Sequence, residues 1–255
     1  MKLLDVDSLG EALFWIPLVP LLGAAALGLL GRWLDRSAVN LVALGTVGTA
    51  AVMSALVLLP MAAPVLFGSG PISSVGGSLG TWFSAGGLTV RASFVADHLS
   101  AVLATVVTGV GLLVHLYSTG YMAEDEGYAR YFAYLNLFVG SMLLLLLAND
   151  LVLMFVGWEG VGLCSYLLVG FWFDDDQKAF AGRKAFVVNR VGDFGLLVGL
   201  FVLLALFGTT EIQPGAGASE SLLTASRGLD LAAPVAAGPL ASRGLSLGGA
   251  LTLAC

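Results

Sequence analysis

The feature that most constrains the fold of this chain is a series of apolar runs separated by short polar connections. As a helix, a run of about 20 residues crosses the ~30 Å hydrocarbon core of a bilayer. Six runs are long enough, at residues 12–30, 39–59, 99–118, 131–148, 151–172 and 185–207. Charged residues make up 11% of the 255 residues, whereas soluble domains carry about 25%. The sequence therefore predicts an all-α, polytopic transmembrane helix bundle.

A small extramembrane β-hairpin is expected between the second and third runs. Residues 88–94 alternate between apolar and polar side chains, and Gly86 and Gly87 precede them. Two glycines suit a tight turn between antiparallel strands. We therefore expect the hairpin at about residues 81–94, with an irregular loop as the alternative.

The last part of the chain differs in composition from the bundle expected over residues 1–210. Residues 211–246 are rich in Gly, Ala, Ser and Pro, which is typical of a flexible connection. Residues 247–255 begin another apolar run, but nine helical residues reach only ~13 Å. We expect the start of a seventh, truncated helix here, and hence a fragment of a longer protein. A short interfacial tail is the alternative.

The distribution of Lys and Arg indicates an orientation, because these residues favour cytoplasmic loops. Connections after the first, third and fifth runs contain six of them: Arg32, Arg36, Arg130, Lys178, Arg183 and Lys184. The other side contains four: Lys2, Arg91, Arg227 and Arg243. We expect the odd-numbered connections in the cytoplasm, and the N-terminus and hairpin outside.

Composition also argues against several classes of function. The net charge of -6 gives no cationic surface for nucleic acid. Cys164 and Cys255 match no metal-ligand spacing, and we find no cysteine cluster for iron-sulfur chemistry and no Gly-rich phosphate loop. The acidic run at 174–176 is most simply a solvated turn. We expect no metal and no cofactor bound by this chain.

Three charged residues lie deep inside the apolar runs. Glu159 is eight residues past Leu151, or ~12 Å into the membrane core. Arg190 and Asp193 are six and nine residues past Lys184, at depths of ~9 and ~13 Å from the opposite face. A charge at mid-membrane costs at least ~2.5–3.5 kcal/mol, so each of these needs a partner or a function.

The spacing of these charges suggests a proton relay. Arg190 and Asp193 are three residues apart on one helix face and can form an ion pair, which would leave Glu159 unbalanced. A carboxylate in low dielectric takes up a proton when no cation is near and releases it when one approaches. Glycines at 157, 160 and 162 would let a helix or a file of water come close.

Structural interpretations of the same residues remain open. Glu159 can be a helix-to-helix fastener satisfied by Arg190, and the pair of Arg190 with Asp193 can be purely structural. His115, near the end of the third run, is a weaker relay candidate, because a lone intramembrane His is more often a packing residue.

Several long motifs resemble one family. The strings GWEGVGLCSYLLVGFW at 157–172 and KAFVVNRVGDFG at 184–195 closely resemble chain 5, or subunit L, of NADH-quinone oxidoreductase, the respiratory complex I. Three shorter strings follow the same subunit in order: residues 97–100, 108–118 and 120–122. The resemblance covers roughly residues 12–207. The large subunits of multisubunit cation/proton antiporters are less similar in these strings.

The resemblance implies a proton-translocating subunit of an enzyme complex. It places the family's fifth-helix glutamate at Glu159 and its charged sixth-helix pair at Arg190 and Asp193. The lysine that pairs with that glutamate lies beyond residue 255. NADH, flavin, iron-sulfur clusters and quinone are expected in other subunits, and the partners are other membrane-arm subunits in a bacterial inner membrane. A sodium/proton antiporter subunit and a non-transporting scaffold are the alternatives.

Overall fold

The computed structural model describes residues 10, 12–67, 74–85, 88–213 and 221–222. For residues 58–60 and 62–67 it describes the backbone alone. Its elements are α2 (Trp15–Leu30), the 3-10 turn η1 (Gly31–Trp33), α3 (Arg36–Phe67), β1 (Ser74–Ala85), β2 (Leu88–Asp97), α4 (His98–Tyr121), α5 (Tyr128–Leu147), α6 (Leu151–Val169) and α7 (Asp176–Phe207). Six helices in this part of the chain are long and apolar enough to cross a membrane. The predicted multi-pass helical bundle is therefore confirmed.

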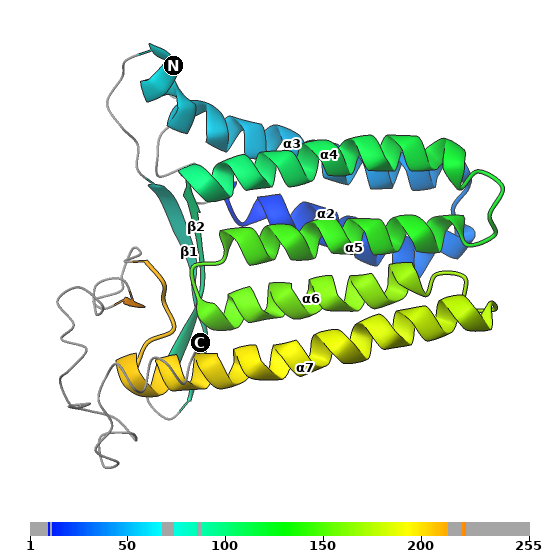
Figure 1. Ribbon diagram of the computed structural model, residues 1–255. Coiled ribbons are helices and arrows are strands. Elements are labelled where there is room, and N and C mark those ends of the chain that lie inside the picture. The colour runs from blue at the N-terminus through cyan, green and yellow to red at the C-terminus, as the bar shows by residue number, and fades with distance from the viewer. Residues whose placement is uncertain (1–9, 11, 68–73, 86–87, 214–220, 223–255) are drawn as a thin grey trace.

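The helices run back and forth along one common direction (Figure 1). The connections from α2 to α3, α4 to α5 and α6 to α7 lie at one end, which we call the loop end. The hairpin and the α5–α6 connection lie at the other, the hairpin end. Helix α5 is central, since it packs against α2, α3, α4 and α6, whereas α7 packs on α6.

Two buried apolar clusters hold the bundle together, one towards each end. The cluster at the hairpin end joins five helices to the hairpin: Ile16 lies on α2, Val47 on α3, Ala101 on α4, Leu143 on α5, Leu153 on α6 and Phe94 on β2. The cluster at the loop end contains Leu27, Val39, Tyr128, Phe132 and Phe171. Packing at both ends of α5 fixes its rotation, and therefore fixes which face it turns towards α6.

The predicted hairpin is confirmed and is longer than expected. Its strands pair antiparallel from Ser74 with Asp97 to Ala85 with Leu88, with irregular register near Thr81. Gly80 lies in this irregular part with a φ of 105°, a conformation that favours glycine. The apolar alternation was strong only in the second strand, which explains why the sequence underestimated the first.

Two helix boundaries differ from expectation. The second apolar run ends at residue 59, directly before Pro60, but α3 continues to Phe67, because a proline removes a helical hydrogen bond without forcing an end. The last helix begins at Asp176 rather than near 185, because Asp175 accepts hydrogen bonds from the backbone N–H groups of Gln177 and Lys178. Apolar runs mark only the part of a helix inside the membrane. Most of the connection expected at 211–246 lies outside the described residues, which include only 211–213 and 221–222 of it. The helix start expected at 247–255 lies outside them entirely.

Candidate functional site

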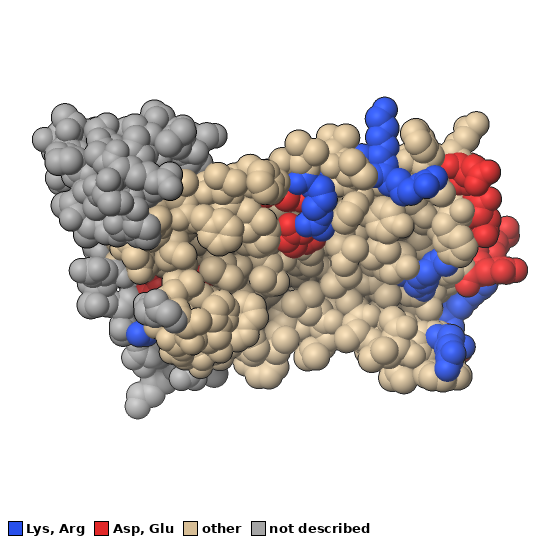
Figure 2. All heavy atoms as spheres, turned by 90° about the horizontal axis from the view of Figure 1, so that it is seen from below, with Lys and Arg blue, Asp and Glu red and all other residues tan. Residues whose placement is uncertain are grey.

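A charged cluster lies halfway along the bundle, where α6 and α7 face each other. Glu159 is the ninth residue of the 19-residue helix α6, and Arg190 and Asp193 lie near the middle of α7. In Figure 2 a small group of basic and acidic side chains lies among uncharged residues on the face shown, apart from the charges gathered towards one end. The depth expected from residue counting agrees with this position.

Arg190 contacts two carboxylates at once. Its Nη1 donates to Glu159 Oε2 across the helix interface and lies 3.7 Å from Asp193 Oδ2 on its own helix. The predicted pair of Arg190 and Asp193 is therefore present. The expectation that Glu159 would be left unbalanced is wrong, because a guanidinium has several N–H donors and can serve two carboxylates. The guanidinium carbon Cζ of Arg190 also lies 4.7 Å from the centre of the Phe186 ring.

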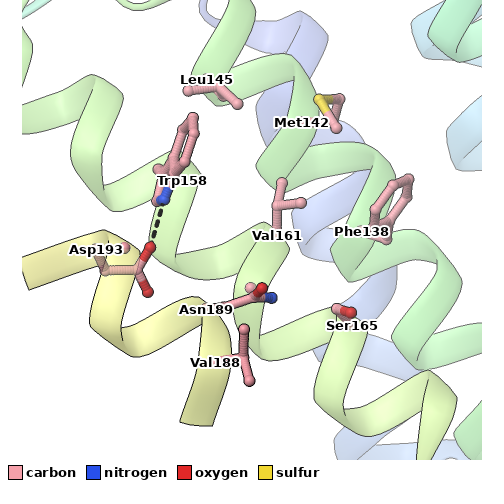
Figure 3. A pocket seen from close by; sticks show the side chains of 11 residues that line it. Phe138, Met142, Leu145, Trp158, Val161, Ser165, Val188, Asn189 and Asp193 are labelled. Carbon is pink, nitrogen blue, oxygen red and sulfur yellow. Dashed lines mark hydrogen bonds between the residues drawn. The ribbon is translucent and has the colours of Figure 1, made fainter. Parts of the chain in front are cut away.

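Asp193 is held by a third group that the sequence did not single out. The indole Nε1 of Trp158 donates to Asp193 Oδ1 at 2.7 Å, shown by the dashed line in Figure 3. The side chain of Asp193 is 9% exposed, whereas that of Arg190 is 41% exposed. The carboxylate is therefore fixed from two sides, and the guanidinium is the more accessible member of the cluster. In the sequence, only the position of Trp158 beside Glu159 pointed to the site.

A cavity of about 620 Å³ opens beside this cluster. Its wall combines Phe138, Met142 and Leu145 of α5 with side chains of α6 and α7, including Ser165, Asn189 and Asp193 (Figure 3). The wall is mostly apolar, with these polar groups on the α6–α7 side. The carboxylate of Asp193 therefore borders a space large enough for water molecules.

Two of the three glycines near Glu159 make close helix contacts. A Cβ on Gly157 would lie 2.5 Å from the backbone N of Leu145, and one on Gly160 would lie 2.5 Å from the Ser141 hydroxyl oxygen. A Cβ on Gly162 would meet nothing within 4 Å. Gly157 and Gly160 thus let α6 approach α5, as expected for small residues at membrane helix interfaces.

His115 lies in a separate buried network. Its Nδ1 is 2.7 Å from the carbonyl O of Gly111, which can only accept, so Nδ1 carries the hydrogen. Its Nε2 is 3.5 Å from the amide N of Asn136, and the Asn136 Oδ1 accepts from the Thr46 hydroxyl at 2.7 Å. The network joins α3, α4 and α5. The structure does not bring His115 into the Glu159 cluster, although Phe138 and Met142 line both the cavity beside Asp193 and a second one beside His115.

Comparison with known proteins identifies the family. Residues 82–132 match the family described as NADH-ubiquinone oxidoreductase (complex I), chain 5 N-terminus. Residues 148–226 match the family described as NADH:quinone oxidoreductase/Mrp antiporter, TM.

The chain belongs to the chain 5, or subunit L, family of complex I.

NADH-quinone oxidoreductase subunit L of Mycobacterium tuberculosis is 45% identical over 222 residues, which are 86% of this chain and 34% of the relative. The same subunit of Escherichia coli is 44% identical over 197 residues, 77% of this chain and 31% of the relative. The chain thus spans about a third of the length of these curated relatives. A solved Mrp complex from Dietzia has a TM-score of 0.62 at 28% identity, covering 78% of this chain and 20% of that one.

Proposed function

We propose that this chain carries part of the proton path of a membrane subunit of NADH:quinone oxidoreductase. The observation that carries the proposal is one guanidinium, that of Arg190, between the carboxylates of Glu159 and Asp193 at mid-depth in the bundle. Two anions and one cation leave one carboxylate charge without a matching cation inside the cluster. A proton on a carboxylate is the smallest change that balances this charge.

Movement of Arg190 couples protonation to geometry. When the guanidinium lies against Glu159, it favours the ionised carboxylate. When it shifts towards Asp193, which Trp158 holds in place, Glu159 loses its cation and takes up a proton. Return of the guanidinium expels that proton towards the adjacent cavity or a further acceptor. A conformational change elsewhere drives transfer only if it changes the relative stability of these two positions.

The chemistry of electron transfer belongs to other subunits in this proposal. NADH, flavin, iron-sulfur clusters and quinone would be bound there, while this chain would contact the other membrane-arm subunits and the bilayer. A lysine in the remainder of the subunit would provide the next cation along the path. His115, with Asn136 and Thr46, would be a secondary polar group outside the main path.

We place the protein in a bacterial inner membrane with the N-terminus and hairpin outside. Support comes from six cations in or beside the connections at the loop end: Arg32 in η1, Arg36 and Arg130 in the first turns of α3 and α5, and Lys178, Arg183 and Lys184 near the start of α7. The structure gathers these connections at one end of the bundle (Figure 1). Cytoplasmic loops favour Lys and Arg, so we assign this end to the cytoplasm.

The test is Glu159→Gln in the full-length subunit, assembled in its complex. Inverted membrane vesicles would be assayed for NADH-driven quinone reduction and, with a pH-sensitive dye, for proton uptake. We expect the ratio of protons taken up to NADH oxidised to fall, because glutamine cannot carry a proton between ionised and neutral forms. Asp35→Asn, at an exposed carboxylate between η1 and α3, is the control and should leave the ratio unchanged. An unchanged ratio in the Glu159 variant would contradict the proposal.

A subunit of a cation/proton antiporter is the second candidate, favoured by the similarity to the Dietzia Mrp complex. The higher identity to subunit L supports the first. Sodium-dependent proton exchange in vesicles without NADH would support the antiporter instead.

A further inference from the structure

A second buried charge cluster lies at the hairpin end, where isolated β-bridges join three distant segments. Next to β2, Phe94 pairs with Ala148 in the α5–α6 connection, and Asp150 pairs with Glu211 after α7. The backbone N–H of Asn149 donates to the carbonyl O of Ser93, and that of Ile212 donates to the carbonyl O of Asn149. The hairpin is thus joined to the ends of α5, α6 and α7.

Asp150 is buried and well supplied with donors. Its Oδ1 accepts from the backbone N of Val152 at 2.8 Å, at the start of α6. Its Oδ2 accepts from the Thr210 hydroxyl at 2.6 Å. These bonds cap the N-terminus of α6 and give both carboxylate oxygens a donor.

Glu211 is buried but has fewer partners than Asp150. Its Oε1 lies 3.4 Å from Nε of Arg91, and Arg91 is 33% exposed. Its Oε2 has no hydrogen-bond partner within the described part of the chain. Because Glu211 stands directly opposite Asp150 in an antiparallel bridge, their side chains lie on the same face, where like charges repel each other.

We propose that Glu211 is a proton-binding site at the hairpin end, with the proton carried on Oε2. Uptake forms an O–H bond to a proton from the surrounding water and leaves a neutral carboxyl beside Asp150. Arg91 of β2 and Asp150 of the α5–α6 connection are the charged groups that face Glu211 from the packed segments described here. This site is distinct from the cluster at Glu159 and does not depend on the function proposed above.

The electrostatics support this assignment. Burial raises the pKa of Glu211, the guanidinium of Arg91 lowers it, and the carboxylate of Asp150 raises it again, with a net upward shift. The folded protein therefore keeps this proton to a higher pH than the unfolded chain does. The free energy of unfolding should fall as pH rises from the ordinary glutamate pKa through the raised folded pKa.

The experiment is a pH titration of the purified protein in lipid nanodiscs, followed by infrared spectroscopy of protonated carboxyl groups. We expect wild type to show carboxylic-acid absorption, shifted in heavy water, and Glu211→Gln to remove one titrating band from it. Glu124→Gln, at an exposed carboxylate near the loop end, is the matched control and should keep the band. Persistence of the full band in the Glu211 variant would overturn the proposal.

Two further variants test the proposal even if Glu211→Gln does not fold. Asp150→Asn keeps a good helix cap but removes the neighbouring charge, so the titration midpoint of the band should move to lower pH, by roughly one unit. Arg91→Gln removes the cation and should move the midpoint to higher pH. Absence of these opposite shifts would contradict the proposal, since a purely structural role predicts neither. A band that disappears on adding sodium at constant pH would show a sodium site and also overturn it.

Discussion

Trp158 and Arg190 contact the same carboxylate from two different helices. The indole lies 2.7 Å from Asp193 Oδ1, and the guanidinium lies 3.7 Å from Oδ2. A fixed Asp193 gives Arg190 a second position to occupy when it leaves Glu159. At the scale of single residues, the proposed relay thus depends on an anchor that does not itself carry the proton.

Trp158→Phe tests this anchor. Loss of the hydrogen bond to a carboxylate should lower the free energy of unfolding by about 1–3 kcal/mol. Denaturant unfolding in detergent measures this change, and Trp15→Phe, at an exposed position on α2, is the control. Equal stability of the two variants would show that the indole does not anchor Asp193.

The network at His115 predicts a graded pair of variants. Asn136→Leu removes the donor to Nε2 of His115 and the acceptor for Thr46, and should cost about 1–3 kcal/mol of stability. Thr46→Val removes one hydroxyl and leaves both donor bonds of Asn136, so it should cost less. The same unfolding measurement compares them, and a larger loss in the Thr46 variant would contradict the arrangement.

The residue scale is where sequence reasoning was least complete. Glu159, Arg190 and Asp193 were identifiable because charges are rare inside apolar runs. The partners Trp158 and Asp193 are 35 positions apart, and Asp150 and Thr210 are 60 apart. Such contacts depend on how the helices are rotated about their axes, which apolar run lengths do not specify.

Between elements, α5 and α6 approach through backbone contact at Gly157. Gly157→Ala would place a Cβ 2.5 Å from the backbone N of Leu145, so the helices must separate. We expect a loss of about 1–3 kcal/mol in the free energy of unfolding. Gly162→Ala on the same helix meets open space and should change stability by no more than about 1 kcal/mol. Equal effects of the two variants would contradict the observed packing.

The start of α4 predicts a pH dependence. The side chain of Asp97 accepts from the backbone N of Ser100 at 2.8 Å, and the Ser100 hydroxyl accepts from the backbone N of Asp97 at 2.8 Å. Burial by itself would raise the pKa of Asp97, but the hydrogen bonds from Ser100 and from the nearby backbone together outweigh it, and the net pKa is lowered. The ionised cap therefore stabilises the fold above the ordinary aspartate pKa, and this contribution is lost as pH falls through the lowered folded pKa.

Asp97→Ala should cost about 0.5–2 kcal/mol at neutral pH. Asp97→Asn keeps a cap that does not titrate, so wild type should lose stability relative to this variant in acid. Unfolding curves at several pH values measure both effects. A constant difference between wild type and Asp97→Asn would rule out a role for the ionised cap.

At the scale of elements, the number of helices and the hairpin followed from the sequence because apolar runs and strand alternation are local signals. The start of α7 did not, since its first turns precede the apolar run and depend on the Asp175 cap. The continuation of α3 past Pro60 was also missed, because a proline signal is ambiguous inside a membrane helix.

For the whole molecule, the two ends of the bundle differ in charge and structure. The orientation proposal places the hairpin outside and the cation-rich connections in the cytoplasm. In a variant with both native cysteines replaced by serine, Ser84→Cys on β1 should react with a membrane-impermeant maleimide in intact spheroplasts. Gln177→Cys at the start of α7 should react only after permeabilisation. The reverse pattern would invert the topology.

The central claim is that Glu159 carries a proton and does more than fasten two helices. Exchanging the charges in Glu159→Arg/Arg190→Glu, in the assembled complex, separates these roles, because a fastener works in either direction. Proton uptake per NADH oxidised is the measurement, with complex assembly checked on native gels. We expect the double variant to assemble better than either single variant but to keep a lowered proton ratio. A wild-type ratio in the double variant would show that the pair is only structural.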